Sequence, residues 1–504
     1  MTETQTAVHD GETAVESRGH FINGTVVPGA GEPIRRYSPA TGELVAAFAN
    51  GSPADVDAAV AAARTAFDTG VWSELPGLER GRVLLRFAAL MREHVDELTA
   101  LDADEVGNPR RVARANVLGA IDDTEFAAAL AGVVHGDVHT NLGTDFTGMM
   151  VREPIGVAGL IVPWNFPTLV LCQKLSFALA AGCAAVVKPS ELTSSSALLL
   201  AELATAAGVP AGVLNVVTGY GDRAGQHLAE HKDVDLVSFT GSTATGRKIM
   251  AAAQENLTRV ALELGGKSAQ IVFADADLDD AVEGVLFGVV HNQGECCLAG
   301  SRLLVEQRIA ERFLDLLTER AAGLRLGGPH DEADLGALIH PEHLHKVLRY
   351  IETAVSEGAS VRAGGHRLTG ATHANGCFVA PTVLDRVTPE HRAFQEEIFG
   401  PVVTVTRFTD RDEAAELANA VEYGLGNSVW TKNIDTALLL SRRLRSGTVF
   451  INTTIDGSPQ LAFGGYKASG FGREKGTTGL EEFTQLKTVQ IRTGKRAGSF
   501  NLLG

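Results

Sequence analysis

Two adjacent cysteines stand in the segment HNQGECCLAG at 291–300, in a chain that has only five cysteines. A thiolate is a strong nucleophile, but a free thiol has a pKa of about 8.5 and stays mostly protonated at neutral pH unless its surroundings help. The odd number of cysteines and their spacing fit neither a disulfide framework nor a zinc site. The pair therefore indicates covalent chemistry and leaves open which thiol performs it.

Two further polar residues could assist such a nucleophile. Asn165 lies in PWNFP (163–167), where two prolines fix the backbone, and an amide held rigidly there can donate hydrogen bonds to an oxyanion. Glu263 is a lone acid in the apolar segment LELGGK (262–267), and burial would raise its pKa toward the range of a general base. Taken singly, a structural turn is the better explanation of the Asn165 motif, and a structural salt bridge explains Glu263 as well as catalysis does.

Three segments have the composition of a nucleotide site. FTGSTATG (239–246) follows an apolar run and opens a helix, so that Gly241 permits a tight turn and Ser242 can meet a phosphate. Lys188 and Glu191 in KPSE (188–191) are suited to ribose hydroxyls. An ordinary helix cap and a surface turn are the alternatives, and GYGDRAG (219–225) is better explained as a turn because its glycine spacing is wrong.

Short apolar runs at 157–162, 183–187, 213–217, 235–239 and 259–264 alternate with helix-like segments. This pattern predicts an α/β fold with a parallel sheet covered on both faces, whose ligands bind beyond the carboxyl ends of the strands. A helix over 52–67 is expected, with Ser52 as its cap and Pro53 at its first position. A helix at 279–291 and a strand at 301–306 place the cysteine pair on the link between them.

Length and charge limit the possible classes of protein. A chain of 504 residues is long enough for two or three domains, and a net charge of −17 disfavours nucleic acid or an anionic membrane as a partner. The longest apolar run, at 177–187, is too short to cross a bilayer. Residues 1–20 have no secretory or transit pattern and are expected to form a disordered tail, which together with the cysteine usage indicates a cytoplasmic protein.

The segments PWNFP, KPSE, FTGSTATG, LELGGK, NQGECCLAG, EEIFGP (396–401) and FGGYKASG (463–470) follow one another as in the aldehyde dehydrogenase superfamily. The chain resembles this family from residue 21 to its end. The resemblance implies that Cys297 is the nucleophile, that Asn165 and the Cys297 N–H hold the oxyanion, and that Glu263 activates the water that hydrolyses a thioester. Cys296 falls at the variable position, Glu295 replaces the usual glutamine, and no metal is implied.

The resemblance also implies a nicotinamide cofactor, and we expect NAD rather than NADP because the Glu191 carboxylate would repel a 2′-phosphate. Lys188 and Glu191 would contact the adenine ribose, and Lys174 and Glu474 match positions of a possible proton relay. The other cofactor residues implied are Ile161, Pro163, Trp164, Gly221, Phe239, Gly241, Ser242, Leu264, Glu397 and Phe399.

The substrate pocket implied by the resemblance has few aromatic rings, which favours a medium or large aldehyde. Its expected residues are Phe166, Val170, Gln173, Cys296, Ile455 and Phe463. Two other reactions stay open. A CoA-acylating semialdehyde dehydrogenase typically lacks the general base, and a redox-silent cysteine thioesterase would need a histidine such as His291 beside the nucleophile.

The architecture implied by the family has three parts. A Rossmann-like cofactor domain covers residues 21–132 and 155–264, and an α/β catalytic domain covers 265–468. The segments 133–154 and 482–504 supply strands for oligomerisation, so a homo-oligomer, either a dimer or a tetramer, is expected. The expected partner is a small-molecule aldehyde substrate, without nucleic acid or membrane.

Overall fold

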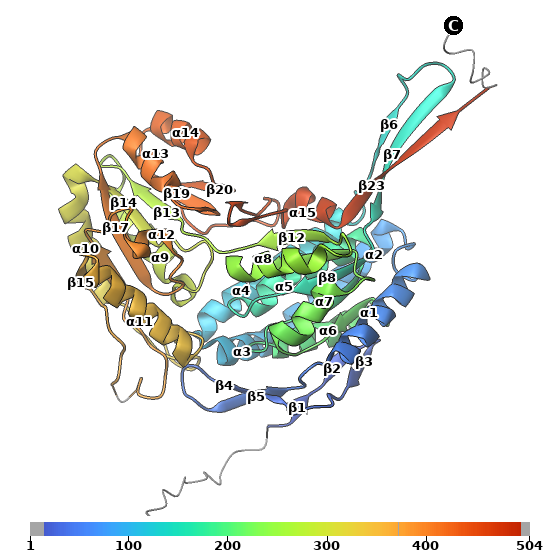
Figure 1. The fold of residues 1–504 in the computed structure, drawn as a ribbon, viewed down its shortest axis with the longest axis horizontal. Helices are drawn as coiled ribbons and strands as arrows, with labels where there is room; N and C mark the ends of the chain where they lie inside the picture. Colours follow the sequence, from blue (N-terminus) through green and yellow to red (C-terminus); the bar gives the residue numbers. More distant parts are fainter. Residues whose placement is uncertain (1–14, 371, 495–504) are drawn as a thin grey trace, which may run out of the picture.

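The computed structural model describes residues 15–370 and 372–494. Two lobes, each built around a largely parallel sheet with helices, lie side by side, and a small third sheet projects from one of them (Figure 1). The predicted α/β class is confirmed. No helix in the described residues is long and apolar enough to span a membrane.

The first lobe contains an eight-stranded sheet whose five central strands are parallel and correspond to the five predicted apolar runs. Because β8 lies between β9 and β11, the strand order reverses there, and ligands bind at the carboxyl ends beside such a reversal. In spatial order the strands are β22 (Gly470–Phe471), β12 (Arg259–Glu263), β11 (Leu236–Thr240), β8 (Val157–Ile161), β9 (Ala184–Lys188), β10 (Leu214–Val216), β2 (His20–Ile22) and β3 (Thr25–Val27).

Helices cover both faces of this sheet (Figure 1). The first begins as predicted, because the Ser52 side chain accepts from the Asp55 N–H and the Asp55 side chain accepts from the Ser52 N–H. Residues 221–225 form a short π-helix instead of the expected turn, since the Tyr220 carbonyl accepts from three successive N–H groups. The helices are α1 (Pro53–Asp68), α2 (Gly77–Glu93), α3 (Val95–Val106), α4 (Arg110–Leu130), α5 (Pro167–Ala181), α6 (Ser195–Ala207), α7 (Gln226–Glu230) and α8 (Thr243–Ala253).

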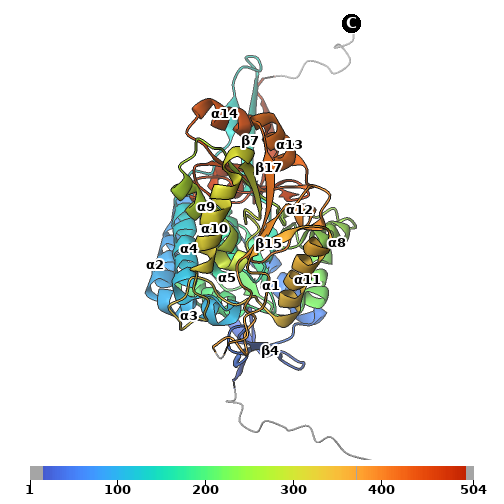
Figure 2. The ribbon, with the colours of Figure 1, turned by 90° about the vertical axis from the view of Figure 1, so that its left-hand side faces the viewer.

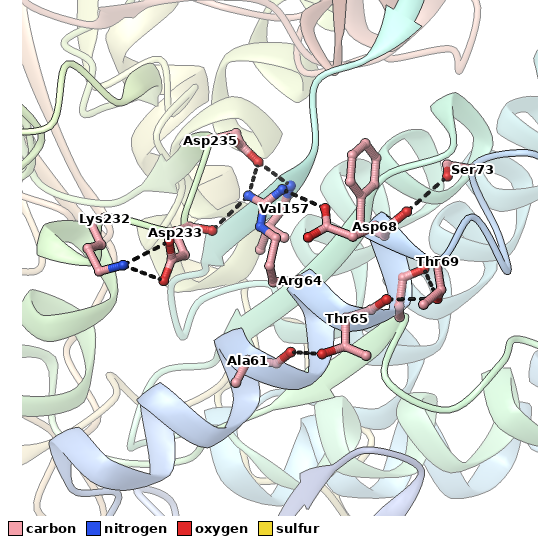
Figure 3. Close-up of polar contacts among 12 residues, drawn as sticks. Ala61, Arg64, Thr65, Asp68, Thr69, Ser73, Val157, Lys232, Asp233 and Asp235 are labelled. Atoms are coloured by element: carbon pink, nitrogen blue, oxygen red, sulfur yellow. Dashed lines mark hydrogen bonds and ion pairs between the residues drawn. The ribbon is translucent and has the colours of Figure 1, made fainter.

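A polar cluster ties α1 to the amino ends of β8 and β11 (Figure 3). The Asp235 carboxylate accepts from the Val157 N–H at 2.7 Å and pairs with the Arg64 guanidinium, which also donates to the Asp233 carbonyl at 2.9 Å. The cluster lies at the opposite end of these strands from PWNFP and FTGSTATG, so it stabilises the sheet without touching the candidate site.

We expect Asp235→Ala to lower the free energy of unfolding by about 1–3 kcal/mol, because it leaves the Val157 N–H and the Arg64 guanidinium without this acceptor. Asp68→Ala is the matched control: Asp68 meets the same guanidinium at 3.5 Å but is 60% exposed, so its loss should cost less than about 0.5 kcal/mol. Thermal unfolding of the two variants measures the two losses of stability. Equal midpoints would show that Asp235 has no special role.

The second lobe contains a seven-stranded sheet, parallel except for β15. Its spatial order is β15 (Ser360–Ala363), β16 (Thr382–Asp385), β17 (Val402–Phe408), β14 (Arg302–Glu306), β13 (Ala269–Val272), β19 (Gly426–Trp430) and β20 (Thr448–Ile451). Figure 2 views this lobe from the side with α9, α10 and α11 in front. The helices are α9 (Leu278–Val290), α10 (Ala310–Ala322), α11 (Pro341–Ser356), α12 (Arg392–Gln395), α13 (Arg411–Asn419) and α14 (Ile434–Arg443). The cysteine pair lies between α9 and β14, as predicted.

The projecting sheet has three antiparallel strands, β6 (Asp137–His139), β7 (Phe146–Pro154) and β23 (Thr484–Arg492). The last two pair along their whole length, from Thr484 opposite Pro154 to Arg492 opposite Phe146. The expected tail boundary at residue 20 is wrong. β1 (Ser17–Arg18) pairs with β5 (Leu44–Phe48), which also pairs with β4 (Ile34–Tyr37), and His20 is buried. Residues 1–14 and 495–504 lie outside the described residues.

The chain crosses between the two lobes twice, and both crossings lie next to Glu263. One passage joins β12 to β13, and the other returns from β20 through β21 (Tyr466–Lys467) to β22. The two passages are hydrogen-bonded to each other, because the Leu264 N–H donates to the Ser469 carbonyl at 3.0 Å and the Ser469 hydroxyl donates to the Gly265 carbonyl at 2.7 Å. The chain then forms α15 (Gly476–Glu482) and enters β23.

Candidate active site

The cysteine loop follows α9 through a tight turn in which Asn292, Gln293 and Gly294 all have positive φ, at 52°, 56° and 75°. After this turn Cys296 is buried, whereas Cys297 is partly exposed. A Cβ added to Gly266 would lie 2.3 Å from the Cys297 carbonyl oxygen, so LELGGK packs directly against the loop. Cys297 is therefore the more accessible thiol and lies beside the predicted base segment.

The surroundings of Cys297 favour its protonated form. Its pKa is raised well above the ordinary value by a hydrogen bond with Cys296 and by burial, and the nearby carboxyl groups of Glu397 and Glu263 act in the same direction. A nucleophilic thiolate at this position therefore needs positive charge or a proton acceptor close by.

Asn165 lies between the end of β8 and the start of α5, with its side chain buried against the cysteine loop. Its Nδ2 donates to the Glu295 carbonyl at 2.9 Å, and its own backbone carbonyl accepts from Asn292 Nδ2 at 2.9 Å. The Asn165 amide is thus fixed on a carbonyl two residues before Cys297 in the sequence. One of the two N–H hydrogens of the amide is left for another acceptor.

Glu263 ends β12 and is buried, with Oε2 lacking a hydrogen-bond partner among the described residues. Burial raises the pKa of Glu263 well above its ordinary value, and the neighbouring Glu474 raises it further, while Lys174 opposes both. Lys174 is fully buried, forms an ion pair with Glu474, and donates to the Ser238 hydroxyl at 2.9 Å. The charges of the three predicted residues Glu263, Lys174 and Glu474 therefore act directly on one another.

The predicted cofactor residues gather where β8, β9 and β11 end. Lys188 Nζ lies 3.3 Å from the Glu191 carboxylate, and burial lowers the Lys188 pKa. Ser242 is exposed and caps α8 by accepting from the Thr245 N–H at 3.2 Å. Gly221 lies beside Lys188, since its added Cβ would meet Nζ at 4.0 Å.

A second group of predicted cofactor residues joins the two lobes. The Glu397 carboxylate accepts from the Gly266 N–H at 2.9 Å, and the Trp164 ring meets the Phe399 ring edge-on at 5.5 Å. Phe399 has a φ of 63°. The remaining residues of this prediction lie at or just after the ends of β8, β11 and β12; they are Ile161, Pro163, Phe239, Gly241 and Leu264.

Most of the predicted pocket residues belong to the apolar core of the first lobe or pack against it. Phe166, Val170 and Cys296 are buried members of that core, and Ile455 packs against it. The Gln173 amide donates to the buried Asp123 carboxylate at 3.2 Å. Phe463 pairs with Glu474 through two backbone hydrogen bonds, so it lies beside the Glu474–Lys174 pair.

Two histidines lie at the candidate site: the sequence singled out His291 only as the base that a thioesterase would need, and it did not single out His343. The His291 ring stacks on Phe166 at 5.7 Å and meets Phe287 at 5.0 Å, and burial lowers its pKa to about 4. His343, on α11, contacts the Phe399 carbonyl through Nε2 at 2.6 Å. His291 was visible in the sequence because it ends the helix predicted at 279–291. Nothing local in the sequence marks the second, because it lies 56 residues from Phe399.

Within the described residues, no group of three or more histidine, cysteine, aspartate or glutamate side chains could hold a metal ion.

Comparison with known proteins decides the family. The profile of the aldehyde dehydrogenase family matches residues 26–489. The chain belongs to the aldehyde dehydrogenase family. It is 44% identical to the NADP/NAD-dependent aldehyde dehydrogenase PuuC of Escherichia coli (strain K12), over 95% of this chain and 96% of that protein.

Solved structures of aldehyde dehydrogenases share its fold. An NAD-dependent aldehyde dehydrogenase from Sinorhizobium meliloti is 45% identical, with a TM-score of 0.94 over 96% of both chains. A betaine aldehyde dehydrogenase from Staphylococcus aureus in complex with NAD+ is 36% identical, with a TM-score of 0.94 over 96% of both chains. This aldehyde dehydrogenase therefore has the family's enzyme class and fold, and the resemblance seen in its sequence is confirmed.

Proposed function

We propose that this aldehyde dehydrogenase oxidises an aldehyde to its carboxylic acid with NAD+, through a covalent intermediate on Cys297. The observation that carries the proposal is that the segments PWNFP and LELGGK both lie against the loop of the partly exposed Cys297 thiol. Gly266 packs against the Cys297 carbonyl, the Asn165 amide is fixed on the adjoining Glu295 carbonyl, and the Glu263 carboxyl acts on the Cys297 pKa.

The residues present fit a dinucleotide. An exposed helix start at Ser242 beside the strand reversal suits the pyrophosphate, and the Lys188–Glu191 pair suits the adenine ribose. Glu397 acts on the Cys297 pKa, Phe399 lies two residues further along and packs on Trp164, and these two residues would hold the nicotinamide ribose and ring. We favour NAD over NADP because the Glu191 carboxylate would repel a 2′-phosphate. The relatives include an NAD-dependent enzyme and an NADP/NAD-dependent one.

In the proposed reaction the Cys297 thiolate attacks the aldehyde carbon, and the oxyanion accepts from the free Asn165 N–H and from the Cys297 backbone N–H. Bound NAD+ supplies the acceptor for the hydride that the resulting thiohemiacetal loses. Glu263 removes a proton from the water that attacks the thioester, so that the acid leaves and the Cys297 thiolate is restored. The Lys174–Glu474 pair would pass that proton on from Glu263.

Two alternatives are less well supported. A CoA-acylating enzyme typically has no general base, whereas Glu263 is present and buried beside the site. A cysteine hydrolase needs a histidine near its nucleophile, but the His291 ring packs between Phe166 and Phe287 and its lowered pKa makes it a weak base.

The substrate that we propose is a medium or large aldehyde. Gly457 and Thr454 contribute no aromatic ring to the loop beside Ile455, and the wall formed by Phe166 and Val170 leads along α5 to the polar Gln173. Residues four and seven positions after Phe166 lie on its side of the helix, so this wall extends for two turns, about 10 Å.

A panel of aldehydes of graded size tests the proposal, with the absorbance of the reduced cofactor as readout. We expect turnover with NAD and without CoA, a higher kcat/KM for larger aldehydes than for acetaldehyde, and at least about a tenfold preference for NAD over NADP. Glu191→Gln should reduce that preference. A requirement for CoA would reverse the choice of acyl acceptor, and a wild type that favours NADP would reject the role of Glu191.

We also propose that the projecting sheet joins copies of the chain into a dimer or tetramer, because β23 is exposed along most of its length and lies at the sheet's edge. The cofactor domain (21–132 and 155–264), the catalytic domain (265–468) and the strand segments (133–154 and 482–504) are the proposed units. The five free cysteines accord with the cytoplasm as the proposed compartment.

A further inference from the structure

Glu295 is a buried acid that the proposed reaction does not use. Its side chain is fully buried two residues before Cys297. Oε1 accepts from the Ile339 N–H at 2.9 Å, and Oε2 accepts from Gln293 Nε2 at 3.4 Å. A carboxyl group that is removed from water costs free energy unless it has partners of this kind.

The surroundings of the Glu295 carboxyl favour its neutral form. Burial raises the pKa of Glu295 well above its ordinary value, while hydrogen bonds and the Arg36 guanidinium oppose the rise. His343 Nε2 lies 3.6 Å from Oε1, and that imidazole is kept neutral by its own lowered pKa of about 4. A neutral acid has the shape and acceptor oxygen of glutamine, which is the residue usual at this position in the family.

The Glu295 backbone carbonyl has a separate task. It accepts from the side-chain amides of both Asn165, at 2.9 Å, and Asn292, at 3.1 Å. The position of this one oxygen therefore sets the direction of the Asn165 Nδ2–H bonds, including the hydrogen that is left for an oxyanion.

The Asn292 amide bonds that carbonyl from within the turn, but the turn itself needs support from outside. Two residues with side chains, Asn292 and Gln293, adopt left-handed φ, which costs roughly 1–2 kcal/mol for each and persists only when surrounding contacts impose it. The Glu295 side chain supplies such a contact, because Ile339 belongs to a different segment, just before α11. Ile339 is in turn held through its carbonyl by the Arg36 guanidinium at 3.1 Å.

We propose that Glu295 is a positioning residue: its carboxyl, anchored on the Ile339 N–H, fixes the backbone carbonyl that orients the Asn165 amide toward the oxyanion. The inference rests on the proposed function, since it presumes that Asn165 holds the oxyanion. Glu295 touches neither substrate nor cofactor in this assignment and acts only through Asn165.

A double-mutant cycle between Glu295 and Asn165 tests the proposal. Asn165→Ala should lower kcat by about 10²–10³-fold, as expected for the loss of one oxyanion donor. Glu295→Ala should lower kcat by about 10–100-fold with the KM for NAD unchanged, and the double variant should be no slower than Asn165→Ala alone, because both changes remove the same interaction. Effects that multiply in the double variant would overturn the proposal.

Conservative variants separate positioning from folding. Glu295→Gln keeps an acceptor for the Ile339 N–H and should retain kcat within about threefold, whereas Glu295→Asp withdraws the carboxyl by one methylene and should behave like Glu295→Ala. If Glu295→Ala does not fold, the Asp variant completes the cycle. A slow Gln variant would contradict the proposal. Full activity of Asn165→Ala would instead reject the oxyanion role in the proposed function.

Discussion

Cys297→Ala is expected to reduce kcat for aldehyde oxidation by roughly 10⁴-fold or more, because no other group can form the covalent intermediate once the attacking sulfur is gone. Cys296, the adjacent thiol, is buried and cannot take its place without moving the loop. The measurement is NAD reduction with the best aldehyde of the panel. Binding of NAD, followed by fluorescence quenching, should be nearly unchanged, since the expected cofactor contacts of Glu191 and Ser242 lie elsewhere.

Cys296→Ala is the matched control, because it removes the same group one residue away. It also removes the hydrogen bond that raises the Cys297 pKa, so it should retain turnover and should react faster with iodoacetamide at neutral pH. Peptide mass spectrometry of acid-quenched enzyme should place the acyl group on Cys297. An acyl group on another residue, or loss of activity in Cys296→Ala alone, would refute the assignment of the nucleophile.

Glu263→Gln should stop the reaction at the thioester. We expect a burst of reduced cofactor close to one equivalent per active site, followed by turnover about 10²–10⁴-fold slower than that of the wild type, because water is no longer activated. The amide fills the same space in the buried position, so the protein should fold. Glu481→Gln on α15, a half-exposed partner of Arg152, is the control and should have no burst.

The pH dependence of the same step provides a second readout. Burial and Glu474 raise the pKa of Glu263, so the proton-accepting carboxylate becomes more populated as pH rises. The wild-type rate of thioester hydrolysis should therefore increase with pH, and this increase should be absent in Glu263→Gln. Restoration of the variant's turnover by added CoA would show that thiols can replace water, whereas wild-type turnover that needs CoA would contradict the hydrolytic route.

Much of the fold was predictable because the buried strands are short, continuous and apolar. The five runs from 157 to 264 form the parallel centre of the first sheet, and the capping pattern at Ser52 marks the start of α1 correctly. The tail boundary was wrong since the pattern of acidic residues ends before Ser17, and nothing local shows that Ser17–Arg18 pairs with a strand near residue 47.

The positions of candidate residues were predictable where these residues follow directly on strands, as with Asn165 after β8 and Glu263 at the end of β12. Contacts between residues of distant segments could not be predicted from the sequence. Asp123 meets Gln173 between two helices, and Ile339 meets Glu295 beside the left-handed turn at Asn292, from 44 residues further along the chain. Non-glycine residues with positive φ have no reliable signature in sequence, since their conformation is imposed by packing.

The two passages of the chain between the lobes meet at Glu263, where Leu264 is bonded to Ser469 and Glu263 lies opposite Gly470. Bending of one lobe on the other at these joined passages would make them a hinge. Glu263, which is proposed to activate water, lies at that hinge. Such bending would leave the hydrolytic carboxyl in its place, so that aldehyde binding and thioester hydrolysis could be altered by mutation separately.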